Sequence, residues 1–127
     1  MPLVRIDIPT ATTSKDALTL CGGVHQALVK TFDVPLQDRF QTIHRRPQGE
    51  LLCTPEFLGI NHSASVVFIQ IFCSFGRSLE VKKALYSEIV RQISSQTAFS
   101  EADIIINLVE TSRENWSFGN GLAQYAL

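Results

Sequence analysis

The sequence lacks the features of several large protein classes. Its formal net charge is -1, with 11 Lys and Arg residues against 12 Asp and Glu residues, so there is no basic excess for nucleic acid or an acidic membrane surface. The longest apolar run, Val66 to Cys73, is too short to span a bilayer and contains Gln70. The N-terminus carries Arg5 and Asp7 where a signal peptide needs an apolar segment. We therefore predict a cytoplasmic protein with no nucleic-acid or membrane partner.

Cysteine and histidine give no sign of a metal centre. The 3 cysteines are odd in number and form no CxxC pair, which favours reduced thiols over a disulfide framework. His44 and His62 have neither the spacing of zinc ligands nor an accompanying motif. His25 lies inside a predicted helix, where a packed or surface histidine is the simpler interpretation. The sequence thus predicts no metal site.

What the chain does contain is typical of one globular domain. Its length of 127 residues is enough to bury a core, and 45% apolar and 18% charged residues fit a soluble fold. Leu3 to Ile8 alternates with the period of a strand. Thr12-Thr13-Ser14 offers N-caps for a helix that runs to Phe32 and ends before Pro35. Arg39 to His44 predicts a second strand.

The second part of the chain repeats this order. Residues 45–63 are rich in Pro, Gly and polar residues and read as an excursion between two halves. The Val66–Cys73 run predicts a strand buried on both faces, as in a parallel sheet covered by helices. Ser78 is a good N-cap for a helix to about Ser95, and Ile104 to Val109 predicts another buried strand. A turn-rich tail follows from Glu110.

Two glycines interrupt the first predicted helix. Gly22 and Gly23 each weaken a helix interior by about 1 kcal/mol relative to alanine. We expect a close approach of this helix to a sheet to compensate.

The two parts match at a constant offset. Equivalent features differ by 63 or 64 positions: the first strands start near Leu3 and Val66, the helix caps are Ser14 and Ser78, and Arg39 corresponds to Asp103. A constant offset predicts two βαβ units, residues 1–44 and 65–109, related by a pseudo-twofold axis in one domain. The predicted fold class is α/β (α+β): a four-stranded mixed sheet with two helices on one face.

The opening Met1-Pro2 suggests chemistry at the N-terminus. If Met1 is trimmed, Pro2 becomes a secondary amine, whose pKa of about 8 a dry pocket lowers and a carboxylate raises. Such an amine can act as a general base or a general acid near neutral pH. The alternative is that Pro2 is an ordinary second residue.

Three further segments carry a family resemblance. Val34 to Thr42, with the pattern VPxxDR(F/Y)Q, and the segment Asn115-Trp116-Ser117-Phe118-Gly119 resemble those of malonate semialdehyde decarboxylases in the tautomerase superfamily. Gly76-Arg77-Ser78 stands where that group has an arginine at the end of the third strand. The resemblance implies a homotrimer, a prolyl amine near the subunit interfaces, small oxo or enol carboxylates as substrates, and no metal or organic cofactor.

The resemblance also implies site residues. Pro2, Asp38 and Arg77 would be catalytic, and Arg77, Phe75, Trp116 and Phe118 would bind substrate. Decarboxylases of this type commonly carry an Arg-Pro-Arg arrangement, whereas this chain has Phe75-Gly76-Arg77 and so a single arginine.

Each of these residues has a simpler alternative. Asp38 could be a solvated turn residue and Arg77 an exposed loop cation, while Trp116 and Phe118 could be core or interface aromatics. Tyr125 could cover the pocket of a neighbouring subunit.

The resemblance leads to one expected function and two alternatives. The leading expectation is decarboxylation or hydration of a 3-oxo acid, in which Arg77 holds the carboxylate and Asp38 keeps the Pro2 amine protonated or orients water. The alternative enzyme is a keto–enol tautomerase of a 2-oxo acid such as phenylpyruvate. The alternative outside enzymes is a trimeric binding protein whose amine is unused.

Overall fold

The structure is a computed structural model that describes all residues from Met1 to Leu127. The main elements, in chain order, are β1 (Leu3–Pro9), α1 (Ser14–Phe32), β2 (Phe40–Arg46), β3 (Glu56–Phe57), β4 (Ile60–Asn61), β5 (Val67–Ser74), α2 (Leu79–Gln96) and β6 (Ile104–Thr111). Short 3₁₀ turns occur at Glu101–Asp103, Arg113–Asn115 and Gln124–Ala126. No helix is long and apolar enough to cross a membrane.

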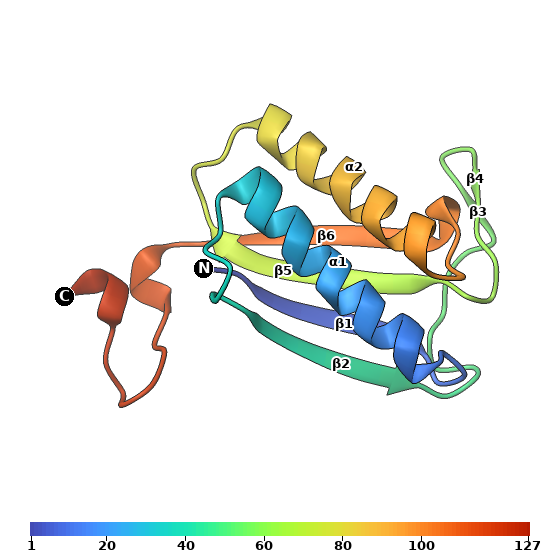
Figure 1. The fold of residues 1–127 in the computed structure, drawn as a ribbon, viewed down its shortest axis with the longest axis horizontal. Coiled ribbons are helices and arrows are strands. Elements are labelled where there is room, and N and C mark those ends of the chain that lie inside the picture. Colours follow the sequence, from blue (N-terminus) through green and yellow to red (C-terminus); the bar gives the residue numbers. More distant parts are fainter.

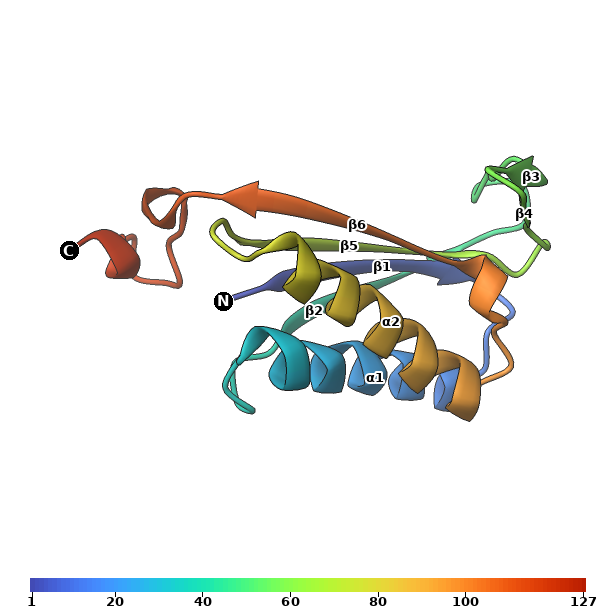
Figure 2. The ribbon, with the colours of Figure 1, turned by 90° about the horizontal axis from the view of Figure 1, so that it is seen from above.

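Two βαβ units form one mixed sheet, as the sequence predicts. The strand order is β2-β1-β5-β6, and β1 pairs in parallel with β2 while β5 pairs in parallel with β6. The two units meet where β1 runs antiparallel to β5. Both helices lie on the same face of the sheet (Figure 1), and the view from above shows the other face without a helix (Figure 2). The predicted fold class is therefore confirmed.

The prediction that the third strand is buried on both faces is wrong. Buried and half-buried residues alternate along β5, with Val67, Ile69, Ile71 and Cys73 beneath the helices. Phe68, Gln70 and Phe72 lie on the opposite face and are only half-buried. The physical reason is that both helices cover one face, so only every second side chain reaches the core. The strand is nevertheless central in the sheet.

The glycine pair in α1 has a different role from the one expected. A Cβ added at Gly23 would lie 3.1 Å from Cβ of Gln92 in α2, whereas one at Gly22 would meet nothing within 4 Å. The close approach is thus between the two helices and not between helix and sheet, and it involves only Gly23. The N-cap of α1 is also Thr13 and not Ser14, because the Thr13 hydroxyl accepts a hydrogen bond from the backbone N–H of Asp16.

Different segments of the chain lie at the two ends of the sheet. The excursion between the units, with its β3–β4 hairpin, lies at the end where β5 and β6 begin (Figure 1). The C-terminal tail extends away from the other end, where β1 begins and β5 ends (Figures 1 and 2). Both chain termini therefore lie at the same end of the molecule.

Candidate active site

The start of β1 brings three parts of the chain together. Leu3 pairs with Phe40 of β2 on one side and with Phe72 of β5 on the other. Pro2 precedes this register and is buried. It therefore lies between the loop that leads into β2 and the loop that leaves β5, which are the loops that carry Asp38 and Arg77.

Asp38 lies next to the N-terminal amine. Its Oδ2 is 3.9 Å from the α-amino nitrogen of Met1, and its side chain is 18% exposed. Its Oδ1 is buried and accepts no hydrogen bond. An unpaired buried carboxylate oxygen costs free energy, so its presence indicates a place for a further donor. Because Met1 is present, the nitrogen of Pro2 is an amide here, and removal of Met1 would transfer the amine to Pro2.

Arg77 is held by main-chain carbonyls and an aromatic ring. Its guanidinium donates to the carbonyl oxygens of Ser74, at 3.2 Å, and Phe32, at 3.3 Å. It also lies 4.1 Å from the centroid of the Phe32 ring, which is a cation–π arrangement. These contacts fix the cation between the end of α1 and the end of β5. Phe75, by contrast, is 66% exposed.

A second ion pair borders Arg77 and was not anticipated from the sequence. Lys82 of α2 donates to Glu110 of β6 at 2.8 Å. This hydrogen bond is the main reason that the pKa of Glu110 lies below its ordinary value, and a hydrogen bond from the backbone of Gly76 and the charge of Arg77 also lower it. Burial raises the pKa of the neighbouring Cys73 thiol, although the charges of Arg77, Lys82 and the N-terminus oppose the shift. The end of β5 therefore carries Arg77 beside an ion pair in which Lys82 and Glu110 offset each other's charge.

The aromatic residues of the C-terminal segment pack against one another. The indole N–H of Trp116 donates to Oγ1 of Thr111 at 2.8 Å. The rings of Trp116 and Phe118 stack at 5.6 Å with an interplanar angle of 12°. Phe118 also contacts Phe40 at the start of β2, at 6.1 Å between centroids. The segment that carries the family resemblance is thus folded back onto the sheet end that holds Asp38.

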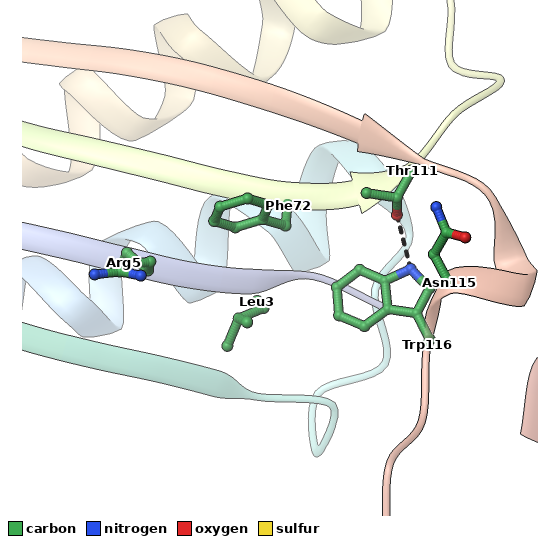
Figure 3. Close-up of a pocket in the computed structure, with 6 residues that line it drawn as sticks. All are labelled: Leu3, Arg5, Phe72, Thr111, Asn115 and Trp116. Atoms are coloured by element: carbon green, nitrogen blue, oxygen red, sulfur yellow. Dashed lines mark hydrogen bonds between the residues drawn. The ribbon is translucent and has the colours of Figure 1, made fainter. Parts of the chain in front are cut away.

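Trp116 lines a cavity of about 260 Å³ on the helix-free face of the sheet. The lining residues are Leu3, Arg5, Phe72, Thr111, Asn115 and Trp116 (Figure 3). The structure therefore brings Trp116 to the start of β1, while Phe118 packs in the aromatic cluster and does not line this cavity. Tyr125, which is absent from the predicted site, packs against Phe118 in the same cluster.

Two other predictions concern histidine and metal ligands. His25 is buried, and its Nε2 lies 2.6 Å from the carbonyl oxygen of Leu36, which identifies it as a packed, hydrogen-bonded residue of α1. No three His, Cys, Asp or Glu side chains lie close enough together to hold a metal ion.

Comparison with known proteins finds one matching family and similar proteins. Residues 38–119 match the model of a family described as tautomerase enzymes. The chain is 31% identical over 125 residues to the probable tautomerase YrdN of Bacillus subtilis (strain 168), covering 98% of this chain and 96% of that protein. It is 32% identical over 124 residues to the probable tautomerase YusQ of the same strain, covering 98% of each.

Similar folds occur in solved structures. A malonate semialdehyde decarboxylase inhibited by 3-bromopropiolate superposes with a TM-score of 0.91 at 31% identity, covering 97% of this chain and 93% of that chain. A second malonate semialdehyde decarboxylase structure gives a TM-score of 0.89 at 32% identity, covering 97% and 95%. A fused 4-OT symmetric trimer shares the fold at a TM-score of 0.79 and 19% identity, covering 98% of each chain.

Proposed function

The chain belongs to the tautomerase family, and on that premise we propose that it uses the N-terminal amine of Pro2 as a general acid or base on a small oxo-carboxylate. The proposed reaction is decarboxylation or hydration of a 3-oxo acid. The similarity to two malonate semialdehyde decarboxylase structures over nearly the whole chain supports this reaction class. No metal or organic cofactor is part of the proposal.

The observation that carries the proposal is the position of Asp38. Its carboxylate lies 3.9 Å from the N-terminal amine and keeps one oxygen without a hydrogen-bond donor. A carboxylate so close favours the protonated form of an amine. After removal of Met1, the Pro2 amine would therefore be an ammonium group, which is suited to stabilise a developing negative charge.

The proposed mechanism begins with binding of the substrate carboxylate by Arg77. Two of the five N–H donors of this guanidinium bond to main-chain carbonyls, so three remain for a ligand. As the C–C bond to the carboxylate breaks and CO₂ leaves, the electron pair moves to the carbonyl oxygen. The prolinium stabilises the resulting enolate, and a proton then returns to carbon. In the hydration reaction, Asp38 would orient the attacking water.

Phe75, Trp116 and Phe118 are proposed to supply the apolar wall of the pocket. Trp116 lines the cavity next to Leu3 (Figure 3). Phe118 supports its ring, and Phe75 is exposed at the end of β5. An apolar wall excludes water and strengthens the electrostatic interactions of the amine and Arg77 with the substrate.

We also propose a homotrimer. Trimeric 4-OT proteins share this fold, and one face of the sheet carries no helix (Figure 2). A sheet face with half-buried apolar side chains is suited to contact between subunits. Light scattering that reported a monomer at micromolar concentration would contradict this assignment.

The alternative enzyme activity is keto–enol tautomerisation of a 2-oxo acid. The observation that favours it is the single arginine at the end of β5, where Phe75 stands in the place of a second cation. In this reaction, a neutral Pro2 amine would act first as a base and then as an acid. A non-catalytic trimer that binds a partner is the remaining alternative.

Side-by-side turnover of malonate semialdehyde and phenylpyruvate tests these functions. The protein should first be shown by mass spectrometry to lack Met1. We expect faster turnover of malonate semialdehyde, and an NMR titration should place the pKa of the prolyl amine above the usual value for an α-amino group. Faster turnover of phenylpyruvate with a depressed pKa would favour the tautomerase, and no turnover of either acid would favour the binding protein.

A further inference from the structure

The helix-free face of the sheet carries an arginine whose side chain has no partner. Arg5 lies in the middle of β1 and is exposed, between the buried residues Val4 and Ile6. Every other arginine side chain donates a hydrogen bond or lies over an aromatic ring; these are Arg39, Arg45, Arg46, Arg77, Arg91 and Arg113. The guanidinium of Arg5 makes no such contact, so all its N–H donors are free.

The neighbours of Arg5 on this face do not neutralise its charge. Arg5 pairs with Thr42 of β2 on one side and with Gln70 of β5 on the other, and both side chains are uncharged. Asp7, the next residue of β1 on the same face, already accepts a hydrogen bond from Arg46 at 2.7 Å. The positive charge of Arg5 is therefore available to a ligand.

Arg5 also borders the cavity of about 260 Å³ on this face. Leu3 and Phe72 lie between Arg5 and Trp116 along the cavity, so its middle part is apolar (Figure 3). No Asp or Glu is among the lining residues, and Arg5 is the charged member of the set. Cavities for drug-sized ligands usually measure about 300–1,000 Å³, so a volume just below that range suits a smaller molecule.

The aromatic wall of the cavity is fixed before any ligand binds. The indole N–H of Trp116 donates to Oγ1 of Thr111 at 2.8 Å, and this hydroxyl lies 3.4 Å from the carbonyl oxygen of Cys73, to which it donates. The ring of Phe118 stacks on the indole. A wall held in this way loses little conformational entropy when a ligand packs against it.

We propose that this cavity is a binding site for a small carboxylate with an apolar or aromatic body. The carboxylate accepts two parallel hydrogen bonds from the planar guanidinium of Arg5, and the body lies over Leu3 and Phe72 toward Trp116. Because Leu3 directly follows Pro2, the bound acid lies beside the start of the strand that carries the candidate amine. The site goes beyond the function proposed above, since binding there requires neither the Pro2 amine nor turnover.

Tryptophan fluorescence measures this binding directly. The chain contains 1 Trp, so the emission reports on Trp116 alone. We expect phenylacetate to change the emission saturably, with a Kd in the millimolar range or below, and phenylacetamide, which has the same shape without the charge, to bind about tenfold more weakly or worse. The absence of a saturable change below about 10 mM phenylacetate, or equal binding of the acid and the amide, would overturn the proposal.

Three charge-removing variants assign the binding to one cation. Arg5→Gln should raise the Kd of phenylacetate about tenfold or more, because it removes the charged donor. Arg77→Gln removes the cation of the candidate active site, and Lys15→Gln removes an exposed charge at the other end of the sheet; both should leave the Kd within about twofold of the native value. Loss of binding in Arg77→Gln but not in Arg5→Gln would place the acid at the candidate active site and overturn the proposal.

The oligomeric state separates a ligand site from a contact between subunits. Arg5 is exposed, so Arg5→Gln should keep the fold and the native mass in light scattering, while phenylacetate binding is weakened. A change of mass in Arg5→Gln without ligand, together with an unchanged Kd for phenylacetate, would make Arg5 an interface residue and contradict the proposal. Neither measurement uses turnover, so failure of the proposed reaction would leave this test intact.

Discussion

The two ends of the sheet each carry an aspartate just before the second strand of a βαβ unit, and the two carboxylates are held in opposite ways. Asp103, one residue before β6, accepts hydrogen bonds from the backbone N–H of Ser63 at 2.7 Å, from the Ser63 hydroxyl and from the Ser100 hydroxyl at 3.1 Å. Asp38, two residues before β2, has one oxygen without a partner and a cation 3.9 Å from the other.

This difference separates a structural carboxylate from a candidate catalytic one in the same architecture. The hydrogen bonds of Asp103 tie the end of the excursion to the start of β6, and the satisfied carboxylate has no remaining need for a ligand. Asp38 buries a carboxylate oxygen without the hydrogen bonds that would offset the free-energy cost of its burial. Of two aspartates that precede the second strands of a repeated fold, the one that is left unsatisfied is the better candidate for chemistry.

The largest expected effect comes from blocking the amine at the Asp38 end. Retention of Met1, or insertion of one residue before Pro2, should lower kcat/KM by about a thousandfold or more, because an amide is neither a general acid nor a general base. The fold should persist, since the start of β1 is otherwise unchanged. Native rates from a protein shown by mass spectrometry to retain Met1 would contradict the mechanism.

Matched substitutions at the two aspartates test the comparison directly. Asp38→Asn should lower kcat/KM about a hundredfold or more and leave the free energy of unfolding unchanged or slightly raised. Asp103→Asn should lower the free energy of unfolding by about 1–3 kcal/mol, because an amide cannot accept every hydrogen bond that the carboxylate accepts, while activity per folded molecule is kept. Urea unfolding and kinetics on both variants provide the measurements. Similar losses of activity in both would show that the two ends are not functionally distinct.

Arg77 should have the next largest effect. Arg77→Ala should lower kcat/KM about ten- to two-hundredfold, the equivalent of about 1.5–3 kcal/mol for a charged hydrogen bond. Arg77→Lys should restore activity only in part, since lysine keeps the charge and loses the planar fork.

A substrate ester separates recognition of the carboxylate from support of the loop. The ester should be a poor substrate for the native protein and should be little affected by Arg77→Ala. If Arg77→Ala reduced acid and ester turnover equally, the contacts of Arg77 with Ser74 and Phe32 would point to a structural role.

The smallest effect concerns the pH dependence of stability at the Asp103 end. Burial alone would raise the pKa of Asp103, but hydrogen bonds from Ser63 and Ser100 and the charge of His62 lower it below the ordinary value of 3.8. A lowered folded-state pKa means that the ionised group stabilises the fold fully above about pH 4 and loses that contribution as the pH falls through the lowered pKa. Urea midpoints measured from about pH 5 to pH 2 should therefore fall less steeply in Asp103→Asn than in the native protein. Identical slopes would remove the contribution assigned to Asp103.

The sequence was sufficient for the fold because its signals are local and repeated. The Ser78 N-cap, the helical spacing and the alternating first strand are read from neighbouring residues, and the constant offset relates the two units. The face that the helices cover is not a local property, and for this reason β5 was expected to be buried on both sides. The contact of Gly23 with Gln92 likewise joins two helices that are about 70 residues apart in the chain, as non-local packing often does.

Only those residues of the candidate site that belong to a recognisable sequence motif could be predicted. Pro2, Asp38 and Arg77 were selected by resemblance, and the sequence contains no pattern that predicts the free Oδ1 of Asp38. The Lys82–Glu110 pair, separated by 28 positions, and the hydrogen bond from the backbone N–H of Phe118 to the Gln124 side chain depend on side-chain geometry that no spacing encodes.

The location of both termini at one end has a practical consequence for handling the protein. An affinity tag before Pro2 would remove the free amine, and a tag after Leu127 would extend the segment that packs against Phe118. The β3–β4 hairpin stands at the opposite end (Figure 1). Leu58, between its two strands, is 84% exposed. A label or surface attachment inserted at this position would leave the amine and the tail unobstructed.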